Sequence, residues 1–290
     1  MDRVVRARFF QVENVSAHDA TFFDCLTRLW EHGRRETYQE IFGGIRVRLE
    51  RFSPEIDADG FVEGEFVRQQ QENVPPIAQD ELPLEGTDDP VGHRCAFRYL
   101  PAINALLLES RRETLTPMRI DAFVKARIQR HKGFFISPIL SETALERLRN
   151  GTPRKVRMRV ARPNELAQVE GDPLDIEDNL ARFQEFLGGP NIEVSAGFPK
   201  GHHEGRLNLG NLNELVRWAT NRRGNVEHLS VKILEEAEPI DIFSEQIKVM
   251  DELELDNRDV ERHYATRRDY LRQAFRDYRP VIERIYGRGD

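Results

Sequence analysis

Cysteine is scarce in this 290-residue chain: only Cys25 and Cys95 occur, and they lie far apart in the sequence. Two cysteines are too few for a disulfide framework, and their spacing suggests neither a metal site nor a redox pair. An isolated cysteine usually behaves as a small apolar side chain. We therefore predict that both thiols are buried in the core.

Long apolar runs are also missing. No stretch approaches the roughly 20 apolar residues that cross a bilayer, and the opening MDRVVRARFFQVENVS reaches Glu13 before a secretory core could form. These absences predict a soluble cytoplasmic protein without membrane insertion.

Recognisable catalytic motifs are absent from the sequence as well. It contains no GxxxxGKS or GxxxxGKT phosphate loop, no GxSxG elbow and no HExxH zinc motif. In GHHEG, residues 201–205, adjacent side chains would not converge on one ion. Glu227 and Lys232 are too loosely spaced to mark a Mg²⁺-dependent nuclease site. We therefore expect no catalytic residues, metal or cofactor, and keep a metal-dependent nuclease or other effector enzyme as an alternative.

The charge of the chain is segregated along its length. The formal net charge is -7, yet residues 111–162 contain fourteen Lys or Arg and four Asp or Glu, a local balance of +10. Such a distribution creates an electric field that acts on binding partners more than on folding.

Hydrophobic periodicity predicts a mixed α/β protein of the α+β class, with an antiparallel sheet in the strand-rich N-terminal part, a strand-helix-strand middle and a long C-terminal helix. The expected strands of the first part are 4–12, 44–52, 60–69, 93–100 and 103–110, with a helix at 19–33. Later strands are expected at 133–140, 152–163, 191–198, 226–234 and 240–256, with helices from 116, 141, 172, 211 and 257. The expected parts are 1–110, 111–256 and 257–290. The last helix packs on the body or pairs with a second copy, and a homodimer is expected.

The helix that opens at Asp172-Pro173 has an apolar stripe that is expected to face the core. Its members are Ile176, Leu180, Phe183 and Leu187.

The strand TPRKVRMRVARP, residues 152–163, carries the strongest functional signal. Val156, Met158 and Val160 alternate with Lys155, Arg157 and Arg159, so a strand would bury the apolar set and expose the cations. Arginine suits bidentate contacts with phosphate. The row therefore predicts contact with a polyanion.

Earlier strands repeat this pattern with Arg6 and Arg8, Arg46 and Arg48, and Arg94 and Arg98. Arginines on neighbouring strands would lie about 5 Å apart and repel each other unless an anion covers them. The alternative is that Glu50, Glu63 and Glu65 pair across the sheet and neutralise the row.

A cationic ridge is expected on the helix before the basic strand, where Lys125, Gln129 and Lys132 follow at i, i+4 and i+7. An ordinary solvated helix face is the alternative. The complete set of expected nucleic-acid contacts is Arg154, Lys155, Arg157, Arg159, Arg162, Lys125, Lys132, Arg111 and Arg112.

The order of elements from FRYLPAINALLLESRRETLTPMRIDAFVKARI through GFFISPILSETALERLRNG and VRMRVARP to residue 256 resembles a family of bacterial and prophage exclusion proteins. That family includes the lambda exclusion protein RexA and the DNA-binding subunit of the Kiwa anti-phage system. The resemblance implies an oligomeric, sequence-independent DNA binder that acts in phage defence. Carried over by position, it supports Lys155, Arg157, Arg159, Lys125 and Lys132 as DNA contacts.

The leading hypothesis is therefore a DNA-binding protein of anti-phage defence or phage exclusion that contacts the phosphate backbone. RNA is a further possible ligand, and a second defence-system protein a further partner. An interaction module whose basic face docks an acidic protein is the other alternative, because residues 70–92 form an acidic segment that departs from the pattern of a dedicated DNA binder.

Overall fold

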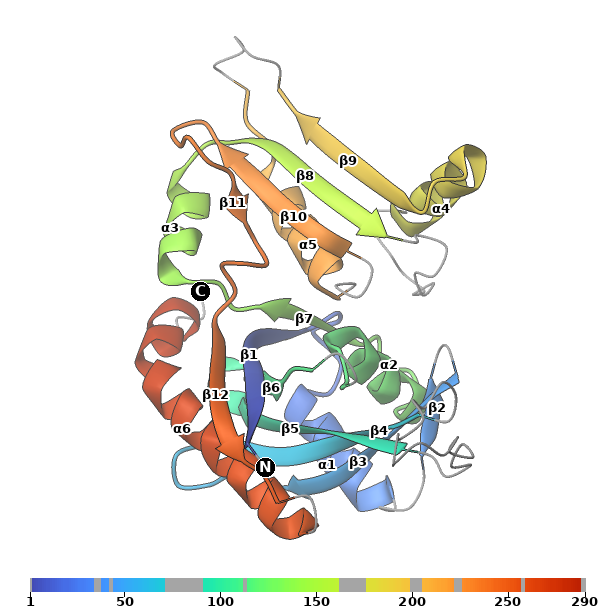
Figure 1. Ribbon diagram of the computed structural model, residues 1–290, viewed down its shortest axis with the longest axis vertical. Helices are drawn as coiled ribbons and strands as arrows, with labels where there is room; N and C mark the ends of the chain where they lie inside the picture. Colours follow the sequence, from blue (N-terminus) through green and yellow to red (C-terminus); the bar gives the residue numbers. More distant parts are fainter. Residues whose placement is uncertain are drawn as a thin grey trace, which may run out of the picture. The chain divides into compact units, whose positions relative to one another are not determined.

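The protein is described here by a computed structural model, which covers residues 2–33, 38–41, 44–70, 91–111, 114–161, 176–198, 205–221, 226–256 and 259–287. The chain forms two compact units, shown with the element labels in Figure 1. Unit 1 comprises Met1–Phe135 and Lys248–Asp290, and unit 2 comprises Ile136–Ile247. The boundaries differ from those expected at 110 and 256. The reason is that the chain returns to the first sheet after residue 247, which a linear pattern does not reveal.

Unit 1 is built on an antiparallel sheet. Its strands are β1 (Asp2–Asn14), β2 (Gln39–Ile41), β3 (Ile45–Ser53), β4 (Val62–Gln70), β5 (Val91–Leu100), β6 (Ala105–Glu109) and β12 (Lys248–Glu254). Their order is β12-β1-β6-β5-β4-β3-β2, and β7 (Phe134–Pro138), at the chain boundary between the units, pairs with β1. The helices are α1 (Phe22–Gly33), α2 (Pro117–Arg127) and α6 (Val260–Tyr286), with a 3₁₀ turn η2 (Pro101–Ile103) between β5 and β6.

Helices cover both faces of this sheet. On one face, Phe22 of α1 meets Tyr99 edge to face at 5.1 Å between ring centroids, and Phe123 of α2 contacts Phe66 in the same way. On the other face, Phe275 of α6 meets Phe9 of β1 at 5.2 Å. These contacts produce a helix-sheet-helix arrangement, in which strand alternation supplies one apolar set to each layer.

The C-terminal helix therefore packs on the body of unit 1. Its N-terminal cap is Asp259, whose carboxylate accepts hydrogen bonds from the backbone N–H groups of Glu261 and Arg262. Leu271, Phe275 and Ile282 are buried. The apolar stripe of α6 is thus buried against unit 1 of the same chain. Pairing of this helix with a second copy stays a prediction.

Unit 2 is a smaller α+β unit. Its elements are α3 (Glu142–Asn150), β8 (Pro153–Ala161), α4 (Ile176–Leu187), β9 (Asn191–Gly197), α5 (Leu209–Asn221), β10 (Val226–Ile233) and β11 (Ile240–Asp241). The strands pair antiparallel in the order β11-β10-β8-β9. Figure 1 shows α5 behind β8 and β10, and Trp218 of α5 is buried in the same core as Met158.

The apolar stripe of α4 is only partly buried. Leu180 is buried as expected, but Phe183 and Leu187 are 58% and 68% exposed. The physical reason is that α4 lies against β9, whose own side chains are largely exposed. The expectation that the whole stripe faces the core is wrong for these two residues.

Both cysteines are buried and free, as predicted. Among the described residues, no helix is long and apolar enough to cross a membrane.

Candidate nucleic-acid interface

Strand β8 presents the predicted row of cations. Val156, Met158 and Val160 are buried, whereas Lys155, Arg157 and Arg159 are exposed. The alternation arises because successive side chains of a strand point to opposite faces. The side chains of Arg157 and Arg159 are 56% and 52% exposed.

The neighbouring strands set the surroundings of these cations. Arg157 lies opposite Ser195 of β9 and Ser230 of β10, and Arg159 lies opposite Glu193 of β9. Arg157 Nε donates to Glu193 Oε1 at 2.7 Å, and Arg159 Nη2 lies 3.4 Å from Glu193 Oε2. The hydrogen bond from Arg157, with the charge of Arg159, lowers the pKa of Glu193 below its ordinary value.

Charge compensation on this strand is therefore incomplete. Glu193 is the only carboxylate within ion-pair distance of Arg157 and Arg159 in the described part of the chain. Lys155, opposite Gly197, has no ion pair there. The outer side of β8 holds three cations, matched by one acid.

Strand β10 extends this face with more weakly basic groups. Lys232, opposite Lys155, donates to the carbonyl oxygens of Glu236 and Ala237, and its charge helps to lower the pKa of the Glu236 carboxylate. His228 Nδ1 lies 3.3 Å from Asp241 Oδ2. The cationic character of the face is thus greatest on β8.

Arg154 does not belong to the exposed row. It is 8% exposed, donates a hydrogen bond to the carbonyl oxygen of Gly205 and lies over the ring of Phe198, 5.2 Å from its centroid. Its side chain therefore links the segments after β9 and before α5, and this burial does not support its expected role as a phosphate contact, which stays a prediction. Arg162 and Arg112 lie outside the described residues.

The expected ridge on the preceding helix does not form. Helix α2 ends at Arg127, and Ile128 is extended, so Lys132 follows the helix instead of completing a face with Lys125. Lys125 lies 3.9 Å from Asp121, one turn earlier. Asp121 also accepts from the N–H of Phe134, a local bond that turns the chain into β7. Lys132 is exposed, but both lysines belong to unit 1 and the strand cations to unit 2.

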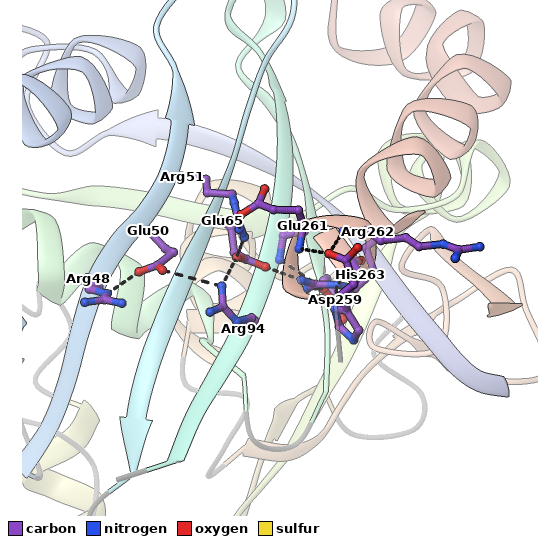
Figure 2. A network of polar contacts seen from close by, with 12 residues as sticks. Arg48, Glu50, Arg51, Glu65, Arg94, Asp259, Glu261, Arg262 and His263 are labelled. Carbon is purple, nitrogen blue, oxygen red and sulfur yellow. Dashed lines mark hydrogen bonds and ion pairs between the residues drawn. The ribbon is translucent and has the colours of Figure 1, made fainter. Parts of the chain in front are cut away.

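The expected arginines of β3 and β5 lie within ion-pair distance of acids, whereas Arg6 of β1 contacts the sulfur of Met250. Figure 2 shows Arg48, Glu50, Arg94, Glu65 and Arg51 following one another across β3, β4 and β5. Both Arg94 and Arg51 contact Glu65 at 2.7 Å. The alternative in which the strand acids pair with the arginines is therefore the one observed here.

The same holds at the next rung, where Arg98 contacts Glu63 and Asp57 at 2.7 Å each. Arg46 lies 3.7 Å from Glu40 at the end of β3. These strands do not present the free cationic surface that their pattern also allowed.

Helix α6 closes this network with a buried arginine that sequence reasoning missed. Arg267 is 1% exposed; its Nη1 donates to Glu109 Oε2 at 2.7 Å, its Nη2 to Glu65, and its Nε to His263 Nδ1 at 3.1 Å. The available signal was a cation between Tyr264 and Leu271 on the apolar stripe of the helix. A charge at such a position is expected to have buried partners.

Arg111, expected as a DNA contact, lies at the edge of this network. Its Nη2 is 3.0 Å from Glu109 Oε1, and its side chain is 28% exposed. It also lines a cavity of about 400 Å³ in unit 1.

The described residues contain no group of three His, Cys, Asp or Glu that could hold a metal ion. His202, His203 and Glu204 of the GHHEG segment lie outside them. A model of a family described as a family of unknown function, DUF6731, matches residues 1–279. No curated protein matches the chain.

Proposed function

The chain belongs to the DUF6731 family, and because that family is described as one of unknown function, we propose a role from geometry: unit 2 binds a nucleic-acid backbone, DNA first, through the outer face of β8. The single observation that carries this proposal is the exposed row Lys155, Arg157 and Arg159, matched by one carboxylate. The binding is independent of sequence.

The spacing of the row suits a phosphate backbone. Alternate residues of a strand are roughly 6.8 Å apart, so the three side chains cover about 14 Å. One strand of B-form DNA carries roughly four phosphates over that length. Long side chains that are half exposed can adjust to such a spacing at little cost because they are not locked in a packed core.

The chemistry of the neighbours also supports a backbone contact. The guanidinium groups of Arg157 and Arg159 can each donate two parallel hydrogen bonds to a phosphate. Ser195, beside Arg157, adds a hydroxyl of the type that often contacts phosphate oxygens. No aromatic side chain stands in the outer row of β8, so stacking on bases is not its mode of contact.

Glu193 would act as an internal competitor of the phosphate. It holds Arg157 and Arg159 in the unbound protein, and a phosphate must displace it from at least one of them. Losing the contacts with Glu193 costs free energy, and several phosphate contacts made together offset this cost better than one does. The arrangement therefore favours a polyanion over a single phosphate.

The test is fluorescence anisotropy with a labelled DNA duplex and a labelled RNA strand at several salt concentrations. We expect a salt slope of about -2.7 for duplex DNA if three phosphates are neutralised. Replacing Arg157 and Arg159 by Ala should make the salt slope less steep by about 1.8. If the variant and the unchanged protein bind equally at 1 M salt, the variant should therefore bind roughly 60-fold more weakly than the unchanged protein at 0.1 M salt. Glu193→Gln should strengthen binding, by at most roughly eightfold, since it removes one competing charge.

The matched control is the double variant Arg149→Ala/Arg182→Ala, which removes the same charge from exposed positions on α3 and α4. It should bind almost as the unchanged protein does. Absence of binding at low salt, or equal losses in both double variants, would refute the proposal. Adding Mg²⁺ or Mn²⁺ and resolving the strands on a denaturing gel tests the nuclease alternative, which cleavage would favour.

The biological setting of phage exclusion stays a prediction from the resemblance. Plating efficiency of phages on cells that produce the unchanged protein or the Arg157→Ala/Arg159→Ala variant tests it. Protection that is lost in the variant is expected, and equal plating on all cells contradicts the prediction.

A further inference from the structure

A basic cavity in unit 1 has no part in the function proposed above. Its volume is about 400 Å³, and six of its eight lining residues are arginine or histidine. These are Arg3, His93, Arg94, Arg111, His263 and Arg267. They come from β1, β5, the segment after β6, and the first turns of α6.

The carboxylates around this cavity are fewer than its arginines. Glu65 and Glu109 are the acids paired with the lining arginines at 3.0 Å or less in the described chain, and their side chains are 0% and 1% exposed. Each is already shared: Glu65 contacts Arg51 as well as Arg94 and Arg267. Glu50 lies farther away, 3.8 Å from Arg94, and is shared with Arg48. The cavity wall therefore has an excess of positive charge.

Parts of two lining arginines are open to solvent: the side chains of Arg94 and Arg111 are 29% and 28% exposed. Arg111 Nε and Nη2 are shielded from solvent and make no hydrogen bond in the described part of the chain, and Nη2 lies 3.0 Å from Glu109 Oε1, so these two atoms do not themselves face the cavity. Arg94 is bonded through Nη1. Arg3 has no ion pair among the described residues. Arg267, in contrast, is fully occupied by Glu65, Glu109 and His263 and supports the wall.

The pKa of His263 is affected by burial and by the same arginines. Burial, followed by the charges of Arg267, Arg111 and Arg3 against that of Glu65, lowers the pKa of His263 to about 4. The neighbouring cations thus oppose a further positive charge, which is the condition that favours a bound anion.

We propose that this cavity binds a phosphate monoester, a small molecule no larger than a mononucleotide. The partly exposed guanidinium groups of Arg94 and Arg111, from separate elements, suit the oxygens of a doubly charged tetrahedral anion. A volume of about 400 Å³ lies within the usual range of small-molecule sites and exceeds what a bare phosphate fills. The neutral imidazole of His263 accepts from Arg267 at Nδ1, which leaves its other nitrogen as a donor.

The experiment uses the purified full chain with three probes: inorganic phosphate, AMP and adenosine. Binding is measured by isothermal titration and by the rise in the thermal midpoint. The test variant is Arg3→Gln/Arg111→Gln, which removes the two cations with the fewest internal bonds. The matched control is Arg46→Gln/Arg276→Gln, an equal charge change at positions outside the cavity of unit 1.

We expect saturable binding of AMP, at least about tenfold weaker in Arg3→Gln/Arg111→Gln because two charge-assisted contacts are lost, and unchanged in the control. Phosphate that binds as tightly as AMP supports the proposal with contacts limited to the phosphate group, and tighter AMP supports it with contacts to the remaining molecule. No saturation with AMP or phosphate up to about 10 mM, equal binding by both variants, or adenosine that binds as well as AMP would overturn it.

The fold of each variant is checked without ligand by its circular dichroism. His263 provides a local readout, since an anion beside it should raise its pKa from about 4 in an NMR titration. Binding without any change at His263 would place the ligand elsewhere and also overturn the proposal.

Discussion

Replacing Arg267 by Met should be among the most destabilising single changes in unit 1. The substitution keeps the length and apolar stem of the side chain and removes its charge. Glu65 and Glu109, which are 0% and 1% exposed, then lose their shared partner. Glu65 keeps Arg51 and Arg94 at 2.7 Å. Glu109 keeps the N–H of Ala96 at 3.2 Å and a misaligned Arg111.

The expected cost follows from the buried carboxylates. Removing one partner of a buried ion pair costs about 3–5 kcal/mol, because the remaining charge is left desolvated and uncompensated. Each kcal/mol lowers the thermal midpoint of a domain of this size by about 2–4 °C, so the fall should be about 6–20 °C. Glu109 has the weaker remaining contacts and should account for most of the loss.

A double-mutant cycle with Glu109→Gln separates this cause from lost packing. The free energy of unfolding is measured by guanidinium titration followed by circular dichroism for each single variant and the pair. The pair should lose at least about 1 kcal/mol less than the sum of the single changes, since the glutamine leaves no buried charge. Arg276→Met, at an exposed position of the same helix, should change stability by less than about 0.5 kcal/mol. Additive losses, or an Arg267→Met variant within about 1 kcal/mol of the unchanged protein, would refute the reasoning.

Three further predictions concern single groups. Cys25 and Cys95 are both buried, which raises the pKa of Cys25 to about 12 and that of Cys95 further, so a thiol reagent should label neither in the native protein and both after denaturation; rapid native labelling would contradict this. His263 has a folded pKa of about 4 against 6.5 when unfolded, so its contribution to stability is full above pH 6.5 and is lost as the pH falls from 6.5 to 4. His263→Gln should flatten that part of the stability profile, and an identical pH dependence of the variant would exclude the mechanism. Gly64→Ala should destabilise unit 1 by about 1–3 kcal/mol in the same titration, because the new Cβ would lie 2.3 Å from the carbonyl oxygen of Arg51; an unchanged midpoint would show that the strands can separate there.

Local patterns carried much of the information about the secondary structure. The alternation in residues 152–163 predicted which side chains of β8 are buried and which are exposed, and the structure confirms it for residues 155–160. Ser141 caps α3 by accepting from the N–H of Ala144, as a serine before a helical segment predicts. Such features depend on residues within a few positions of each other, and the sequence therefore displays them directly.

Other expectations failed where a partner distant in the chain decides the outcome. Arg154 stands next to the basic row in the sequence, but its guanidinium donates a hydrogen bond to the carbonyl oxygen of Gly205, 51 positions later. Lys125 and Lys132 have helical spacing in the sequence, but they do not share a helix face, because α2 ends at Arg127 and the N–H of Phe134 donates to Asp121. The periodicity of α4 also could not show that the strand beneath it, β9, would leave Phe183 and Leu187 exposed.

The sequence by itself determined the α+β class, most of the strands and helices, the buried cysteines and the two faces of β8, because short-range periodicity controls each of them. The strand expected at 240–256 is wrong, because the chain forms β11 in one sheet and β12 in the other. Only the tertiary structure decided which cations are neutralised. Arg267 meets Glu65 across 202 positions and Glu109 across 158, and the same folding places the partly exposed Arg111 at the wall of a cavity. Charge compensation depends on distances of a few ångströms, and those distances arise only when remote segments pack together.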